Sequence, residues 1–210
     1  MQSMGWYQRW VLPRLLDWSL SGEPYTTYRK QLLSAVSGQV LEIGFGTGLN
    51  LAYYPDTVSS LTVIDPNPGM AVIAHPRLQA TSLPIVSQSL RGESLPMADN
   101  MFDWVVSTWT LCSIEGVEQA LGEIRRVLKP GGKFVFIEHG LSPDPKLQIW
   151  QHRLTPLQKC IADGCHLDRA IAELVEQSLT LESLETFYSK GIPKVGGYFY
   201  RGIAVKEEPS

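Results

Sequence analysis

The chain has 210 residues, of which 44% are hydrophobic and 19% charged, and its net charge is −3. This length and composition fit one globular domain and exclude a disordered chain or a fibrous repeat. The negative net charge also argues against a nucleic-acid partner, because surfaces that bind nucleic acids are basic.

The cysteines and the apolar segments indicate the environment of the chain. Its three cysteines are too scattered for a disulfide framework and include no CxxC pair, which favours a reducing, cytoplasmic setting. No run of about 18 apolar residues could cross a bilayer as a transmembrane segment. Arg9, Arg14 and Asp17 interrupt the aromatic opening, so we do not expect a signal peptide. The sequence indicates no oligomeric state.

The predicted elements begin with two short helices, the first capped by Ser3 and the second starting at Pro13, and a third helix over residues 27–37. Apolar and β-branched runs then predict strands at 40–43, 61–64, 84–87, 102–107 and 133–138. Apolar side chains at helical spacing predict a helix over 117–128 between the last two strands, capped by Ser113 and ended by Pro130-Gly131-Gly132.

Near-continuous apolar strands that alternate with helices are typical of a parallel sheet covered on both faces. Two last strands, at 179–188 and 198–205, are separated by a turn rich in glycine and proline. The sequence therefore predicts an α/β, doubly wound Rossmann-like fold, with a mostly parallel seven-stranded sheet and a C-terminal antiparallel hairpin. We divide it into an N-terminal helical lid, residues 1–26, and the α/β domain, residues 27–210.

The clearest functional pattern is the glycine-rich segment Gly44-Phe45-Gly46-Thr47-Gly48 directly after the first predicted strand. Glycine permits a tight turn there and lets a ligand approach the backbone. Asp65 follows Gly44 by about 20 residues and ends the next strand, where an acid in this fold accepts hydrogen bonds from ribose hydroxyls. The pattern predicts an adenosine-containing ligand.

The details of the loop distinguish between two such ligands. A nicotinamide dinucleotide prefers a third glycine three places after the second, whereas here it comes after two places and Leu49 follows. Glu42, in the strand before the loop, would repel a pyrophosphate. Its charge suits the ammonium or sulfonium end of S-adenosylmethionine.

Three segments resemble the motifs of class I S-adenosylmethionine-dependent methyltransferases, of the methyltransferase type 11 or ubiquinone/menaquinone-biosynthesis-like family. They are residues 40–48 (VLEIGFGTG), 95–103 (LPMADNMFD) and 128–132 (LKPGG). Shorter segments resemble the alkyl thiol methyltransferase-like branch, namely residues 64–68, Leu111-Cys112-Ser113, Glu138-His139 and Asp163-Gly164-Cys165 with Arg169.

This resemblance implies a cofactor, S-adenosylmethionine, and a set of contacts. The methionine end would lie on Glu42 and the loop, the ribose on Asp65, and the adenine near Pro66 and Asn67. Arg91 stands where relatives have an acid for the adenine amino group, so backbone near Leu90 or the carboxylate of Glu93 would replace it. The expected cofactor residues are Glu42, Gly44, Phe45, Gly46, Asp65, Pro66, Asn67, Leu90, Thr108 and Trp109.

His139 is the candidate catalytic base, because it follows a strand directly at the edge where ligands bind and titrates near neutral pH. The alternative is a histidine that binds loop backbone or holds the lid. Methyl transfer from a sulfonium needs no metal, and we expect none. We interpret Asp163, Cys165 and His166 as a helix-capping loop with a buried cysteine, not as a nucleophile or a zinc site.

The aromatic N-terminal segment has three possible roles: a lid over the acceptor, packing on the sheet edge, or contact with a membrane surface. The lid hypothesis gives Trp6, Tyr7, Trp10, Tyr28, Trp109 and His139 as substrate-binding residues. The predicted function is S-adenosylmethionine-dependent methyl transfer to a small thiol, amine, quinol-type or lipid-like acceptor. A non-catalytic S-adenosylmethionine-binding module and an NAD-dependent oxidoreductase remain alternatives.

Overall fold

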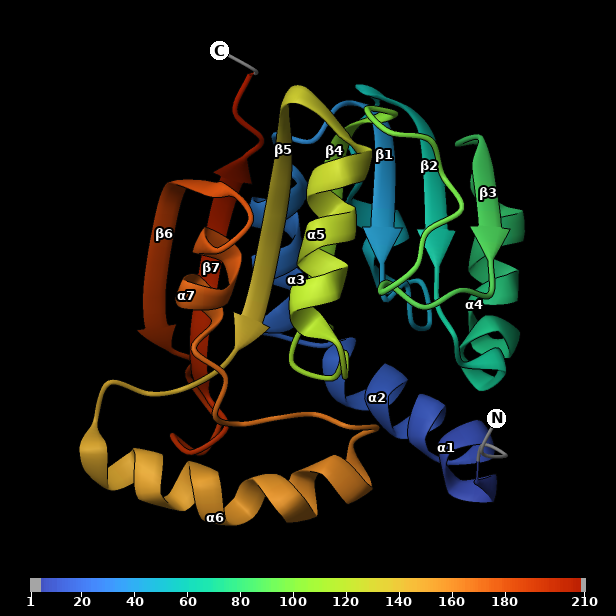
Figure 1. The fold of residues 1–210 in the computed structure, drawn as a ribbon. Helices are drawn as coiled ribbons and strands as arrows, with labels where there is room; N and C mark the ends of the chain where they lie inside the picture. Colours follow the sequence, from blue (N-terminus) through green and yellow to red (C-terminus); the bar gives the residue numbers. More distant parts are fainter. Residues whose placement is uncertain (1–4, 209–210) are drawn as a thin grey trace.

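A seven-stranded sheet of order β3-β2-β1-β4-β5-β7-β6 forms the centre of the computed structural model, which describes residues 5–208 (Figure 1). Strands β1 to β5 pair in parallel, whereas β7 is antiparallel to both β5 and β6. The predicted doubly wound fold with its antiparallel hairpin is confirmed. The strands are β1 (Gly38–Ile43), β2 (Val58–Ile64), β3 (Ile85–Gln88), β4 (Phe102–Thr108), β5 (Leu128–His139), β6 (Thr180–Tyr188) and β7 (Tyr198–Val205).

Helices cover both faces of the sheet and a further group lies at one end of it (Figure 1). They are α1 (Trp6–Trp10), α2 (Leu12–Leu20), α3 (Tyr25–Leu33), the 3₁₀ helix η1 (Leu49–Tyr53), α4 (Pro68–Ala80), α5 (Val117–Val127), α6 (Pro145–Ile161) and α7 (Ile171–Glu176). The predicted helix start at Pro13 is confirmed within the first turn of α2. The proposed cap Ser3 lies outside the described residues.

The central strands of the sheet are buried on both faces, as their apolar residues predict, whereas the edge strands β3 and β6 are largely exposed. In β1, Leu41 and Ile43 pack in one core with α5 and α7, while Val40 packs in the other with α3 and α4. All three side chains are at most 2% exposed. The alternation follows from the two-residue period of a strand, and covering by helices on both sides explains why polar residues are rare here.

Two local expectations are wrong. Gly116, and not Ser113, is the cap of α5, and Ser113 instead closes a turn by donating its backbone N–H to Thr110. The Lys-Pro-Gly-Gly segment after α5 does not stand outside the sheet. It forms the beginning of β5, which pairs with β4 from Leu128 onward, with an irregularity in the register.

The carboxyl ends of the parallel strands all lie at the same edge of the sheet, and α1, α2 and α6 lie beyond that edge (Figure 1). Neither α4 nor α6 was predicted from the sequence. Within residues 5–208, no helix combines the length and apolarity that crossing a membrane requires. The edge covered by α1, α2 and α6 is where doubly wound folds bind ligands.

Candidate active site

The glycine-rich loop leaves β1 at the carboxyl edge and turns sharply into η1. Gly44, Gly46 and Gly48 all have left-handed backbone conformations, with φ of 74°, 56° and 81°. A side chain at Gly44 would overlap that of Thr110, which follows β4, whereas a Cβ at Gly46 would meet only the Gly44 carbonyl oxygen at 3.9 Å. Glycine is therefore required at position 44, because the loop after β4 approaches the glycine-rich loop closely there. At Gly46, by contrast, the backbone is open to a ligand.

Asp65 is held at the end of β2 by two backbone amides. Its carboxylate oxygens accept hydrogen bonds from Gly46 N and Asn67 N, each at 2.8 Å. Each oxygen keeps a second lone pair for a hydroxyl donor. Burial raises the pKa of Asp65 to about 6. A pocket of about 130 Å³ opens beside it, lined by Phe45, Gly46, Val63, Asp65, Asn67, Pro68, Ala71, Ala74, Leu78 and residues 87–89.

Glu42 lies fully buried under the loop in a hydrogen-bonded network. Its two carboxylate oxygens accept from Asn50 Nδ2 at 2.8 Å and from the Tyr54 hydroxyl at 2.7 Å. The Asn50 side chain also donates to Thr108 Oγ1 at 3.1 Å and accepts from Arg29 Nε at 2.9 Å. Burial raises the pKa of Glu42 to about 7, so its charge is poised to respond to a cationic ligand.

Arg29 is a site residue that the sequence did not reveal. It is 3% exposed, donates to the Leu20 carbonyl at 2.7 Å and places its guanidinium 4.9 Å from the ring centre of Trp109. Burial lowers its pKa to about 10, which leaves it charged at neutral pH. In sequence it is one of two adjacent basic residues of a helix, Arg29 and Lys30, and only the fold shows that it points inward.

Trp109 joins the cofactor edge to a group of aromatic side chains. Its backbone is left-handed, with φ of 51°, a conformation that costs free energy and is concentrated at functional sites. Its indole Nε1 is buried without a hydrogen-bond partner among the described residues. Its ring packs edge-on against Tyr25 with centroids 5.1 Å apart. We call the group the aromatic cluster, namely Tyr25, Tyr28, Trp109, Phe187 and Phe199.

The predicted substrate residues divide into two groups. Tyr28 and Trp109 belong to the aromatic cluster, in which each packs against Phe199. Trp6, Tyr7 and Trp10 lie on α1, which packs against α2 and α4. The indole of Trp6 is 72% exposed, and the Tyr7 hydroxyl donates to the Ile161 carbonyl of α6 at 3.0 Å. The structure thus places α1 across the carboxyl edge and apart from the aromatic cluster.

The residues expected near the adenine lie at the start of α4 and in the segment between β3 and β4. The Asn67 side chain caps α4 by accepting from Gly69 N at 2.9 Å, and it donates to the Gln8 carbonyl at 3.0 Å. Its polar atoms are therefore already paired. The Glu93 carboxylate lies 3.5 Å from Gly116 N at the start of α5. The lining of the pocket beside Asp65 ends at Ser89, one residue before Leu90.

His139 lies at the end of β5, and its nearest polar neighbour is a thiol. Its Nε2 is 2.8 Å from Cys165 Sγ, and Cys165 Sγ is 3.6 Å from Cys112 Sγ. Its Nδ1 is buried and has no partner among residues 5–208. The sequence neighbours Cys165 and His166 do not pair, since the His166 ring lies 3.7 Å from Asp168. The Cys–His pair in this structure is therefore formed by residues that are distant in the sequence, Cys165 and His139.

The loop after α6 does cap that helix, as expected. Gly164 N donates to the Lys159 carbonyl at 2.9 Å, and Cys165 N donates to the Ala162 carbonyl at 3.1 Å. Asp163 and Gly164 both have positive φ, which turns the chain back toward the sheet. The buried thiol of Cys165 is thereby directed at His139.

Glu138 is a second residue that the sequence did not single out as functional. Its fully buried carboxylate accepts from Ser107 Oγ at 2.9 Å and from the backbone amides of Thr110 (2.9 Å), Leu111 (3.0 Å) and Cys112 (3.4 Å). Burial raises the pKa of this carboxyl. It shapes the loop after β4 and so fixes both the Thr110 contact with Gly44 and the position of Cys112.

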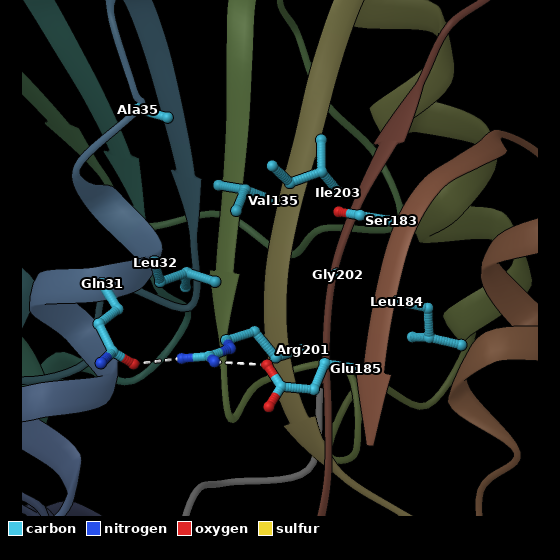
Figure 2. Close-up of a pocket in the computed structure, with 10 residues that line it drawn as sticks. All are labelled: Gln31, Leu32, Ala35, Val135, Ser183, Leu184, Glu185, Arg201, Gly202 and Ile203. Carbon is cyan, nitrogen blue, oxygen red and sulfur yellow. Dashed lines mark hydrogen bonds and ion pairs between the residues drawn. The ribbon is translucent and has the colours of Figure 1, made fainter. Parts of the chain in front are cut away.

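A larger pocket, of about 390 Å³, lies elsewhere, between α3 and the face of the sheet (Figure 2). Figure 2 shows Arg201 crossing it between Gln31 and Glu185. Its floor consists of residues from the middle of β5, β6 and β7, such as Val135 and Ile203. It contains none of the predicted site residues, and we place the active site at the carboxyl edge.

Comparison with known proteins shows what the chain is similar to. The model of a family described as "Methyltransferase domain" matches residues 41–136. The thiol S-methyltransferase TMT1B of Rattus norvegicus is 37% identical over 156 residues, which cover 70% of this chain and 62% of the rat protein. The phosphatidylethanolamine N-methyltransferase of Cereibacter sphaeroides is 28% identical over 183 residues, covering 85% of this chain and 87% of that enzyme.

A solved structure shows the same fold. The N-methyltransferase NodS of Bradyrhizobium japonicum, in complex with S-adenosyl-L-homocysteine, superposes with a TM-score of 0.69 at 21% identity, covering 92% of each chain. The chain spans less than two thirds of the thiol methyltransferases that it resembles, so their substrates are not transferred by similarity alone. The matched domain, the motifs and the fold agree: residues 41–136 match a methyltransferase domain, and the chain has the fold of S-adenosylmethionine-dependent methyltransferases of known structure.

Proposed function

We propose that the chain transfers the methyl group of S-adenosylmethionine to the sulfur of a small, largely apolar thiol. The observation that supports this most is the juxtaposition of Glu42, the glycine loop and Asp65 at one edge of the sheet. A buried carboxylate for the cationic end and a second one for the ribose stand on neighbouring strands. The similarity to thiol S-methyltransferases supports the choice of acceptor.

The cofactor contacts follow from these positions. Glu42 would attract the ammonium group, and the Arg29 guanidinium, behind Asn50, would balance the carboxylate of the methionine end. Asp65 would accept from the ribose hydroxyls. Because Nε1 of Trp109 lacks a partner within the described residues, it would serve as a donor to the bound ligands.

The aromatic cluster is the proposed wall of the acceptor site. Flat apolar side chains around Trp109 favour a hydrophobic acceptor and exclude water, which would compete as a nucleophile. We propose His139 as the residue that activates the acceptor, because it ends β5 beside this cluster, opposite Phe199 in the β5–β7 register.

The N-terminal segment, residues 1–26, is the proposed lid. α1 lies against the start of α4 beside Asp65 and reaches α6 through Tyr7, so it connects both sides of the carboxyl edge. The outer side chains Trp6, Trp18 and Trp150 are 72%, 79% and 55% exposed. Tryptophan favours lipid interfaces, so we propose that this end of the molecule contacts a membrane surface from which an apolar thiol enters. A cytoplasmic location remains a prediction.

A methyl-transfer assay with labelled donor tests the proposed activity. The panel contains alkyl and aryl thiols, a quinol precursor and the headgroup amine of phosphatidylethanolamine. We expect turnover of the thiols. Turnover of the amine alone would show that the acceptor is an amine and not a thiol, while the chain would still be a methyltransferase. Tight binding of S-adenosylhomocysteine without any acceptor would favour a non-catalytic module, and binding of NAD instead would overturn the whole assignment.

A further inference from the structure

We propose that Cys112, His139 and Cys165 form a three-ligand zinc site whose fourth position takes the acceptor thiol. This inference rests on the proposed thiol methyltransferase activity and specifies how the acceptor is activated. It concerns three residues that sequence analysis expected to bind no metal. Their ligand atoms, two Sγ and one imidazole nitrogen, all lie within 4.8 Å of one another.

The composition of the cluster matches the preference of one metal ion. Thiolate sulfur and imidazole nitrogen are the ligands that zinc prefers in proteins, and catalytic zinc sites provide three protein ligands and an open position. A tetrahedral ion bound at about 2.3 Å by sulfur and about 2.0 Å by nitrogen separates two sulfurs by about 3.8 Å. Cys112 Sγ and Cys165 Sγ are 3.6 Å apart. They need almost no movement to hold the ion.

The histidine is the ligand that must adjust. Its Nε2 lies 2.8 Å from Cys165 Sγ, whereas a sulfur and a nitrogen on one tetrahedral zinc are about 3.6 Å apart. The His139 ring would therefore withdraw by somewhat less than an ångström. Unlike the two thiols, which are 2% and 6% exposed, the histidine is only partly buried, although its Nδ1 lies inside and has no hydrogen-bond partner among the described residues.

The backbone holds the three ligands from three separate parts of the chain. Cys112 lies in the loop shaped by Glu138, His139 ends β5, and Cys165 follows α6. His166 N donates to the Cys112 carbonyl at 2.9 Å, which fastens the two cysteine loops to each other. Such a fixed arrangement lowers the cost of binding an ion, because little rearrangement is needed.

The position of the cluster connects it to methyl transfer. Cys112 comes two residues after Thr110, whose hydroxyl lies 3.4 Å from the Gly44 carbonyl oxygen in the glycine loop. The loop that carries Cys112 thus contacts the glycine loop, at the proposed donor's end of the site. An acceptor thiol that binds zinc loses its proton to solvent and becomes the thiolate, which is the nucleophilic form. Its sulfur forms the new bond to the methyl carbon while the carbon–sulfonium bond breaks, and that electron pair stays on S-adenosylhomocysteine.

Zinc ligation gives His139 a different role from the base predicted from the sequence. Coordination through Nε2 places the ring proton on Nδ1, so the imidazole no longer accepts a proton from the acceptor. Direct base catalysis by Nδ1 is the alternative for a protein without metal. The two roles exclude each other, and metal analysis distinguishes them.

The test begins with the zinc content of the full-length protein purified without chelators. We expect about one zinc per chain. Cys112→Ser, His139→Gln and Cys165→Ser should each lower zinc affinity by more than the 10- to 100-fold loss typical of removing an outer-shell partner. The matched control is Cys160→Ser, because Cys160 is exposed and outside the cluster, and it should retain the zinc. Calorimetric binding of S-adenosylhomocysteine checks that every variant is folded.

Cobalt substitution provides a readout that does not depend on turnover. Co²⁺ in the site should show a thiolate-to-metal charge-transfer band that changes when 2-mercaptoethanol is added and disappears in Cys165→Ser. Full thiol methylation by protein with less than about a tenth of an equivalent of metal would overturn the zinc site. Zinc content unchanged in the ligand variants would overturn it too. Failure of the wild-type protein to bind S-adenosylhomocysteine would instead refute the proposed function.

Discussion

The shifted pKa of Glu42 predicts how the stability of the protein depends on pH. Burial raises its pKa from 4.5 to about 7, so between these values the folded chain holds a proton that the unfolded chain has released. Stability contributed by this group is therefore present at low pH and lost as the pH rises through about 7. Glu42→Gln should reduce this decline, measured by urea unfolding at several pH values.

The same group should make cofactor binding pH-dependent in the opposite direction. The ionised carboxylate attracts the ligand's ammonium, so affinity for S-adenosylhomocysteine should rise about fourfold between pH 6.5 and 8.5, as expected for a pKa of about 7. Asp65, with a pKa of about 6, is already mostly ionised in this range. Calorimetric titration measures the effect, and Glu42→Gln should bind weakly at every pH. A wild-type affinity that does not vary would contradict the role of Glu42.

Two glycines of one loop should respond differently to the same substitution. Gly46→Ala places a side chain in a left-handed conformation at a cost of about 1–2 kcal/mol. Gly44→Ala has that cost and also overlaps Thr110, which adds about 1–3 kcal/mol. Urea unfolding should therefore rank Gly44→Ala as the less stable variant. Equal stabilities would mean that the approach of the two loops is not maintained in solution.

The candidate site residues that could be predicted are those whose signals lie close together in the sequence. Glu42, the loop and Asp65 were found because two strand ends and a glycine motif are local signals. Arg29 and Asn50 were missed because burial of a polar side chain depends on which helix covers it. The cluster of Cys112, His139 and Cys165 was missed for a related reason, since its members come from three loops that only the folded sheet brings together.

At the scale of elements, the strands and α5 were predictable, whereas the short α7 and the two longer helices α4 and α6 were not. A strand that is buried on both faces and a helix with one apolar stripe give periodic signals. α4 and α6 contain Pro76 and Pro156 in their interiors, residues that normally indicate the end of a helix. Their starts did have a signal, an Asn-Pro and an Asp-Pro pair in which the first side chain caps the helix.

The contact of α2 with α4 allows a test of the proposed lid. Asp17 of α2 pairs with Arg77 of α4 at 2.7 Å, and the same Arg77 nitrogen donates to the Thr47 carbonyl of the glycine loop at 2.7 Å. Asp17→Asn should change stability by at most about 1 kcal/mol, because the pair is partly exposed. If the lid positions the loop, affinity for S-adenosylhomocysteine should fall by about three- to fivefold.

The control for this variant is another partly exposed ion pair, away from the carboxyl edge. Lys133 and Glu182 lie 2.7 Å apart on the sheet. Glu182→Gln should leave the affinity for S-adenosylhomocysteine unchanged. An Asp17→Asn protein that binds as tightly as the wild type would show that α2 only packs against α4.

At the scale of the whole molecule, the proposed site connects elements from both halves of the sheet order. In this proposal the cofactor edge uses β1, β2 and β4, the acceptor side uses β5 and β7, and the N-terminal helices bridge them. A ligand bound across these elements stabilises the native state as a unit. Because the unfolded chain has no such site, the stabilisation follows from mass action.

Thermal unfolding measures this stabilisation by the bound ligand. At 100 times its dissociation constant, S-adenosylhomocysteine adds about 2.7 kcal/mol, and each kcal/mol raises the Tm of a chain of this size by about 2–4 °C. We expect a rise of about 5–10 °C with S-adenosylhomocysteine and none with NAD at the same concentration. Asp65→Ala should abolish most of the rise, since the ribose loses its acceptor. A shift with NAD that equals the shift with S-adenosylhomocysteine would mean that the edge recognises only the adenosine that both ligands share.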